Sequence, residues 1–161
     1  MNGNLEKKSY KLRTIEWKFK EAQKEYPTIH IDGRVKITSP DMVYNSYKDF
    51  FSSLANEHFA VVWLNSSNKI MGFEIISIGT LNSSLVHPRE VFRGAIVAGA
   101  ASIILLHNHP SGNTSPSNED ISITQKLVET GKILDIPVFD HLIITYEGYT
   151  SFMEKRLIIK V

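Results

Sequence analysis

Apolar residues recur every three to four positions in several stretches of the chain, which is the spacing of an amphipathic helix. The first stretch begins at Ser39, a good helix N-cap, followed by Pro40 at the first helical position. The second begins near Pro88 and is rich in small residues, so we expect it to be buried. The third spans 117–130, and Gly131 is expected to end it as the residue after the C-cap.

Apolar runs and alternating patterns predict strands between these helices. Residues 58–64 and 70–79 are apolar and are separated by Asn-Ser-Ser-Asn, which indicates a hairpin. Further strands are predicted weakly at 15–19 and more clearly at 35–38, 102–106, 136–145 and 156–161, with Tyr-Glu-Gly-Tyr (146–149) as a turn. Strands that interleave with helices predict an α/β or α+β fold in which helices pack on a sheet.

The composition is that of an ordinary globular protein. The chain has 161 residues, enough for one domain with a core, and 42% of them are hydrophobic. No run approaches the roughly 18 apolar residues of a membrane span, and the N-terminus lacks the apolar region of a secretory signal. Because cysteine is absent, disulfides and thiolate ligands are excluded. We therefore expect a cytoplasmic protein without a membrane segment.

Positive charge is concentrated near the N-terminus. Residues 1–26 hold seven Lys/Arg against four Glu, whereas the rest of the chain holds eleven against thirteen Asp/Glu. Tyr10, Trp17 and Phe19 lie among these lysines. A solvated basic tail explains the pattern, and an arm that contacts nucleic acid or another partner explains it as well. The expected organisation is a basic segment and linker over 1–34 and a domain over 35–161.

Two histidines follow the predicted strand 102–106. His107 and His109 are two residues apart, so an extended chain places both on one face, about 6.6 Å apart. That separation suits two imidazole nitrogens each about 2 Å from one metal ion. Asp120 falls in the first turn of the next helix, and the loop with Gly112 can fold back. Two His and one Asp leave a fourth position open, as in catalytic zinc sites that activate water.

Ordinary helix capping explains part of the same pattern. Ser117 suits an N-cap, and Asp120 three positions later completes a capping box beside the positive end of the helix. Histidines at strand ends are also common as plain polar residues. On spacing alone, a metal site and a capped turn both remain open.

Two other chemistries do not match the sequence. A zinc deaminase needs a cysteine-rich second ligand segment and a Glu two residues after the first His, where this chain has His109. Ser111 lacks the strand-to-helix elbow and the partner order of a serine nucleophile.

The combined motif resembles that of the JAMM/MPN metalloproteases. His107-x-His109, seven residues and then Ser117-x-x-Asp120 match the motif at every position. The segments HPREVF, HNHPSG, DHLII and GYTSF are similar to the bacterial RadC-like branch (JAB domain), over about residues 35–157. The resemblance implies a JAMM/MPN (cytidine-deaminase-like) fold with a mixed central sheet flanked by helices. It also implies a zinc-dependent peptidase or isopeptidase that hydrolyses an amide bond in a peptide or protein substrate.

The resemblance also implies a role for each site residue. His107, His109 and Asp120 would bind Zn²⁺, and Ser117 would hold the metal-activated water or the developing oxyanion. The family uses an upstream Glu as general base just before an apolar strand, and the segment ANEHFAVVWL matches with Glu57. Such a base must come within about 3 Å of the water.

Other residues are weaker candidates. Glu90 is the alternative base, but it lies in the first turn of a predicted helix, where an acid is stabilising on its own account. Glu74 lies in mid-strand. Asp140 and His141 are interpreted as structural hydrogen-bonding partners that could also buttress the site. His87 and Arg89 are interpreted as capping or surface groups.

Longer RadC-like proteins carry an N-terminal helix-hairpin-helix region associated with DNA binding. In this chain a short basic segment stands in that place. The alternative function is therefore a DNA-associated module of a repair system or mobile element, with a structural or vestigial metal.

Overall fold

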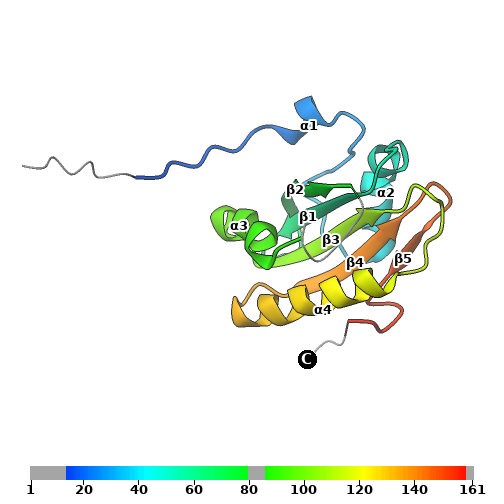
Figure 1. Ribbon diagram of the computed structural model, residues 1–161. Coiled ribbons are helices and arrows are strands. Elements are labelled where there is room, and N and C mark those ends of the chain that lie inside the picture. Colours follow the sequence, from blue (N-terminus) through cyan, green and yellow to red (C-terminus); the bar gives the residue numbers. More distant parts are fainter. Residues whose placement is uncertain (1–13, 80–85, 159–161) are drawn as a thin grey trace, which may run out of the picture.

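The molecule is layered, with a mixed sheet between helices (Figure 1). The computed structural model describes residues 14–79 and 86–158. The strands are β1 His58–Leu64, β2 Ile70–Ile78, β3 Ser102–Asn108, β4 Val138–Ile144 and β5 Tyr149–Ser151. The helices are α1 Ala22–Glu25, α2 Pro40–Ser52, α3 Pro88–Ala98 and α4 Asn118–Ile133. This is the mixed α+β architecture, a central sheet flanked by helices, that the pattern and the resemblance predict.

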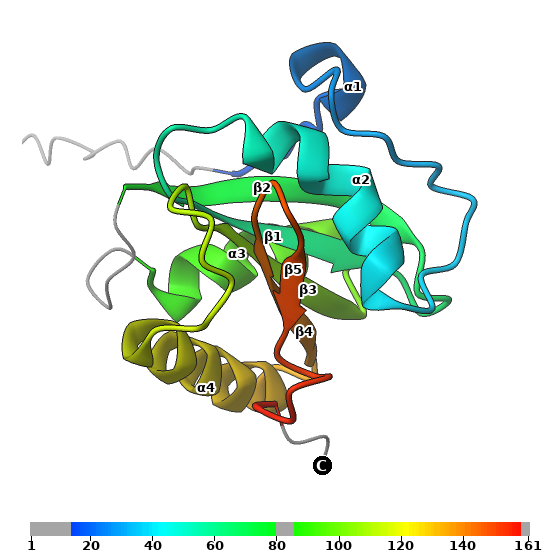
Figure 2. The same cartoon turned by 90° about the vertical axis from the view of Figure 1, so that its right-hand side faces the viewer.

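The strand order within the sheet is β2-β1-β3-β4-β5. β3 and β4 run parallel, and every other neighbouring pair is antiparallel. The parallel pair needs a long crossover connection, and α4 provides it. Figures 1 and 2 show α2 on one face of the sheet, with α3 and α4 on the other.

The sheet separates two hydrophobic clusters. Side chains that alternate along β1 enter different clusters: Phe59 and Val61 pack with α3 and α4, whereas Ala60 and Val62 pack with α2. Because both faces of β1 and β3 are covered, these strands are continuously apolar rather than alternating. The short run at 102–106 is therefore a fully buried central strand, as predicted.

Several local predictions are confirmed. The runs at 58–64 and 70–78 form an antiparallel hairpin. Pro40 is the first residue of α2, and Ser39 is its N-cap, although the Ser39 side chain makes no capping hydrogen bond. α3 begins at Pro88 and ends before Gly99, whose φ of 65° is left-handed.

The helix that was expected to stop before Gly131 continues through it. α4 extends to Ile133, and the chain reverses at Asp135, which has a left-handed φ of 55°. Gly131 lies where the helix meets the segment entering β4, because a Cβ at that position would stand 2.5 Å from the carbonyl oxygen of Ile136. The glycine therefore permits a close backbone approach instead of ending the helix.

Three predicted strands are wrong over the residues that the structure describes. Residues 15–19 pair with no strand, and the sequence at 35–38 contributes a single bridge, between Lys36 and Lys69. Residues 156–158 form no strand, and 159–161 lie outside the described residues. An alternating pattern does not by itself provide a neighbouring strand to pair with. Among the described residues the last strand is β5, which includes Tyr149 from the predicted turn.

α3 is buried on one face only, which corrects the expectation of a buried helix. Val91, Phe92 and Ala95 are buried, whereas Ile96 is 56% exposed.

Within the described residues, no helix is both long and apolar enough to cross a membrane.

We expect Gly131→Ala to destabilise the protein by about 1–3 kcal/mol, the usual cost of overpacking. The added methyl group would collide with the backbone carbonyl of Ile136, which outweighs the gain of about 1 kcal/mol in helix propensity. Urea unfolding measures the change. Gly148→Ala is the control, because a Cβ there meets no atom within 4 Å. A Gly131→Ala protein as stable as wild type would contradict this packing.

Candidate metal centre

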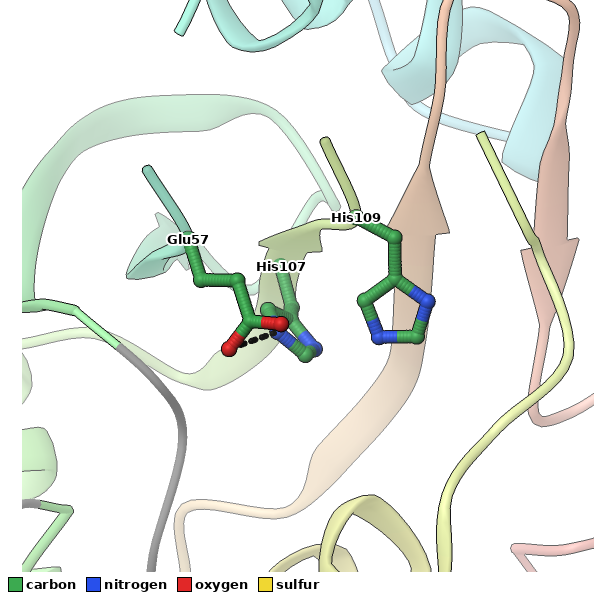
Figure 3. A group of neighbouring side chains, drawn as sticks. All are labelled: Glu57, His107 and His109. Atoms are coloured by element: carbon green, nitrogen blue, oxygen red, sulfur yellow. Dashed lines mark ion pairs between the residues drawn. The ribbon is translucent and has the colours of Figure 1, made fainter. Parts of the chain in front are cut away.

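Four polar residues meet at one end of the sheet. Glu57 directly precedes β1, and Asp120 is in the first turn of α4. His107 is near the end of β3, and His109 directly follows that strand. β1 and β3 pair with Phe59 opposite His107, which sets the start of one strand beside the end of the other. Glu57, His107 and His109 point toward one another (Figure 3), and each offers a ligand atom within 4.8 Å of the others. These residues are a candidate metal-binding group.

Asp120 contacts both histidines. Its Oδ1 is 3.3 Å from His107 Nδ1, and its Oδ2 is 3.4 Å from His109 Nε2. The Asp120 side chain is only 1% exposed. A carboxylate taken so far out of water needs nearby donors or a cation.

The helix cap at Ser117 holds Asp120 in this position. The Ser117 backbone N–H donates to Asp120 Oδ2 at 2.7 Å, and the Asp120 N–H donates to Ser117 Oγ at 3.0 Å. The predicted capping box is therefore confirmed. The same bonds that begin α4 direct the Asp120 carboxylate toward the histidines.

A hydrogen bond determines which nitrogen of His109 is protonated. His109 Nδ1 is 2.6 Å from the carbonyl oxygen of Asn113, which can only accept. Nδ1 therefore carries a proton, and Nε2, 3.4 Å from Asp120 Oδ2, is the nitrogen left to donate to that carboxylate or, when deprotonated, to bind a metal. Metal-binding histidines are commonly oriented by this kind of second bond.

His107 is buried without a hydrogen bond. Its side chain is 1% exposed, and neither ring nitrogen makes a hydrogen bond to any described residue. Leaving a buried polar group unsatisfied costs about 1–3 kcal/mol. A bound cation would satisfy one nitrogen, so the donor set and its burial fit a metal ion.

Burial and local charges set the protonation of these groups. Burial lowers the pKa of His107 to about 4, although the charge of Asp120 opposes it. Burial raises the pKa of Asp120, but hydrogen bonds from His109 and Ser117 outweigh this and lower it overall. A hydrogen bond to Asp120 raises the pKa of His109. At neutral pH the site thus holds a neutral His107 imidazole beside a carboxylate, the forms that bind metal.

The group lies in an open cavity of about 560 Å³. Besides Glu57, the two histidines, Ser117 and Asp120, the cavity is lined by Ser111, Asn113, Ser115, Pro116 and Glu119. The Glu57 side chain is 29% exposed, and its Oε2 is 4.0 Å from His107 Nε2. Glu57 therefore stands between the buried imidazole and the solvent.

A family model described as the RadC-like JAB domain matches residues 37–157. The chain belongs to the RadC-like JAB family. The JAB/MPN family includes hydrolases.

Curated relatives agree with this assignment. The UPF0758 protein of Caldanaerobacter subterraneus is 56% identical over 119 residues, which cover 74% of this chain and 51% of the relative. The UPF0758 protein of Desulforamulus reducens is 50% identical over 127 residues, 79% of this chain and 56% of the relative. The UPF0758 protein of Staphylococcus haemolyticus is also 50% identical, over 122 residues, 76% of this chain and 54% of the relative. The RadC-like chain spans about half the length of these relatives.

The two other glutamates considered as general base, Glu90 and Glu74, do not line the cavity. Arg93 donates to both Glu90 and Glu74, which ties these carboxylates to α3. His87 is the N-cap of α3 but makes no side-chain capping bond, and Arg89 bonds to Glu90. Among the glutamates considered, Glu57 is the one that lines the candidate centre.

His141 packs against the ring of His107. It is fully buried and stacks on the His107 ring, with centroids 6.1 Å apart and an interplanar angle of 28°. His141 Nδ1 is 2.6 Å from Thr124 Oγ1, and Thr124 donates to the carbonyl of Asp120 at 2.5 Å. Asp140 accepts hydrogen bonds from the backbone of His141 and Met153 and from Ser151 Oγ. Both residues thus make structural hydrogen bonds.

Sequence reasoning missed Asn108, Asn113 and Thr124. Asn113 orients His109, and Thr124 connects α4 to His141. Asn113 and Thr124 have no sequence signal beyond proximity to the motif. Asn108 has one more, because it is a polar residue at the end of an apolar run.

Metal-free protein should lose stability as pH falls from about 6.5 to 4. Burial lowers the pKa of His107 to about 4 and of His141 to about 3, from 6.5 when unfolded. In this interval the unfolded chain binds more protons, so the free energy of unfolding falls by about 1.4 kcal/mol per pH unit for each such proton.

Urea unfolding with a chelator at each pH tests this prediction. His141→Gln should flatten the slope, whereas His30→Gln, at an exposed histidine, should leave it unchanged. A free energy of unfolding that is constant between pH 6.5 and 4 would rule out the neutral, buried state of these rings.

Proposed function

We propose that this RadC-like domain is a zinc-dependent peptidase or isopeptidase that hydrolyses an amide bond. The observation that carries the proposal is His107, a buried imidazole without a hydrogen bond to any described residue, beside His109, Asp120 and Glu57. Family membership supports the coarser assignment to metal-dependent hydrolases.

His107, His109 and Asp120 are the proposed ligands. Glu57 and Asp120 compete for the carboxylate position, since each lies close to the imidazoles. Asp120 is favoured because it is buried, is fixed by the Ser117 cap and lies 3.4 Å from His109 Nε2. Bound zinc would supply a Lewis acid that polarises a carbonyl and lowers the pKa of water.

Glu57 is the proposed general base. Its carboxylate is partly exposed to the cavity and stands 4.0 Å from His107 Nε2. From there Glu57 can take a proton from the attacking water at a carboxylate oxygen and return it to the leaving amine. The carboxylate remains a second negative group beside Asp120, so it also favours a cation at this site.

Ser117 is the proposed donor to the developing oxyanion. Its Oγ accepts a hydrogen bond from the Asp120 N–H, which fixes the oxygen at the cavity wall. A hydroxyl that accepts one bond can still donate its own proton. Such a fixed donor stabilises negative charge that forms on the amide oxygen during attack.

Separating the ligand role from the base role tests the assignment. Asp120→Asn and His107→Ala should lower zinc affinity by more than the roughly 100-fold that loss of an outer partner costs. Glu57→Gln should keep zinc but lower kcat for peptide hydrolysis by about 10²–10⁴-fold. Competition with a chromophoric chelator measures affinity, and a library of quenched fluorescent peptides measures hydrolysis.

Glu74→Gln is the matched control, a carboxylate held by Arg93 outside the cavity lining, and should change neither quantity. If Glu57→Gln loses as much zinc as Asp120→Asn, Glu57 is a ligand and another group must act as base. Absence of stoichiometric zinc in wild-type protein would reject the proposal.

We also propose that the segment 14–20 contacts single-stranded nucleic acid. Trp17 and Phe19 are 55% and 65% exposed on an extended segment, and Lys18 lies between them. Exposed aromatic rings interleaved with cations form a stacking platform for bases. In this second function the chain would be a DNA-associated module, and its metal site would be structural or vestigial.

Trp17→Ala with Phe19→Ala should weaken binding to a single-stranded oligonucleotide by about 1–3 kcal/mol per lost stack. Lys18→Gln should reduce the salt slope of binding by about 0.7. Fluorescence anisotropy at several salt concentrations measures both effects. Tyr146→Ala removes another exposed ring, 85% accessible, and should have no effect. No binding by wild type at low salt would exclude this partner.

A further inference from the structure

Asn108 lies between the two proposed ligand histidines but makes its contacts elsewhere. By strand alternation its side chain points to the face of β3 opposite His107. The residue is 2% exposed. Its Oδ1 accepts a hydrogen bond from the His58 backbone N–H at 2.6 Å, and its Nδ2 donates to the Asn56 carbonyl at 3.1 Å. Both groups of the amide are therefore used on another segment.

The orientation of this amide follows from its partners. A backbone N–H can only donate and a carbonyl can only accept, so the oxygen must face His58 and the nitrogen must face Asn56. Aspartate at this position would keep the first bond and place an oxygen against the Asn56 carbonyl. Asparagine is thus matched to both groups.

The two bonds flank Glu57 on either side. The backbone ladder between β1 and β3 reaches the pair Phe59 and His107, and the Asn108 side chain supplies the next connection. From the other neighbouring strand, the Gly79 N–H donates to the Glu57 carbonyl at 2.8 Å. The backbone on both sides of Glu57 is therefore fixed to the sheet.

We propose that Asn108 is a positioning residue that immobilises residues 56–58 and thereby places the Glu57 carboxylate beside the ligand histidines. The inference rests on the proposed function, in which Glu57 is the base. The strand that carries His107 also carries Asn108, so the backbone on both sides of the proposed base is tied to the strand of one proposed ligand. A catalytic group that is misplaced by about 1 Å can lower the reaction rate roughly 100-fold, so fixing the backbone of Glu57 would matter for catalysis.

Visible absorption of bound Co²⁺ is the first readout. Glu57→Gln should shift the Co²⁺ bands, because the carboxylate lies within 4.8 Å of the imidazole nitrogens. Asn108→Ala should shift them in the same direction, and the double variant should add nothing beyond Glu57→Gln alone. Asn108→Asp, which keeps the size of the residue, serves if the alanine variant does not fold.

Amide hydrogen exchange of the full chain is the second readout. Asn108→Ala should accelerate exchange at His58 and at Gly79 by roughly tenfold or more, because the segment opens locally. Asn65→Ala is the matched control. The Asn65 side chain also bonds two backbone groups, here the N–H groups of Ser67 and Lys69, but at the opposite end of β1. It should affect exchange there and leave the Co²⁺ bands unchanged.

Each outcome bears on a different claim. Wild-type Co²⁺ bands in Asn108→Ala, while Glu57→Gln shifts them, would overturn the positioning role and leave the proposed function intact. If Glu57→Gln leaves the bands unchanged, the carboxylate does not lie beside the bound metal, and the placement proposed for Asn108 is overturned; the base role is then judged by kcat alone. Unchanged exchange at His58 and Gly79 in Asn108→Ala would overturn the inference whatever the bands show.

Discussion

The antiparallel register of β1 and β3 is the constraint on which the candidate centre depends. Because Phe59 lies opposite His107, Glu57, the residue directly before β1, lines the cavity of the candidate centre. A slip of one residue would turn His107 to the other face and bury the wrong side chains of both strands. Because two hydrophobic clusters enclose this pair of strands, such a slip would disturb both cores at once. The packing of the fold thus fixes the geometry of its polar end.

Polar groups at this end are costly, and the fold compensates for them in different ways. The helix cap bonds the Asp120 carboxylate, a loop carbonyl accepts from His109 Nδ1, and Thr124 bonds His141 Nδ1. His107 is satisfied by none of the described residues. His141 Nε2 also lacks a hydrogen-bond partner among the described residues, but His107 lacks one at both ring nitrogens and lies beside the Asp120 carboxylate, an arrangement that fits a metal ligand. Metal-free protein should accordingly carry this cost until a cation binds.

Much of the fold was predictable because its signals are local. The cap at Ser117, the proline at the start of α2 and the 58–78 hairpin each follow from a few neighbouring residues. The motif from His107 to Asp120 predicted which residues meet, but spacing could not distinguish a ligand from a cap. Gly131 was misassigned because its constraint comes from Ile136 across a turn. Asn108 was missed because its partners lie about fifty residues earlier in the chain.

That difference in sequence distance has a consequence for how the centre assembles. His107, His109 and Asp120 belong to one β3–α4 unit, so closing the short loop between them brings the three proposed ligands together. Glu57 joins only when β1 docks on β3, which closes a far longer loop at a higher entropic cost. A partly folded chain can therefore bring the three proposed ligands together before Glu57 reaches them. If the proposed function holds, the order of assembly delays hydrolysis until the surrounding sheet is complete.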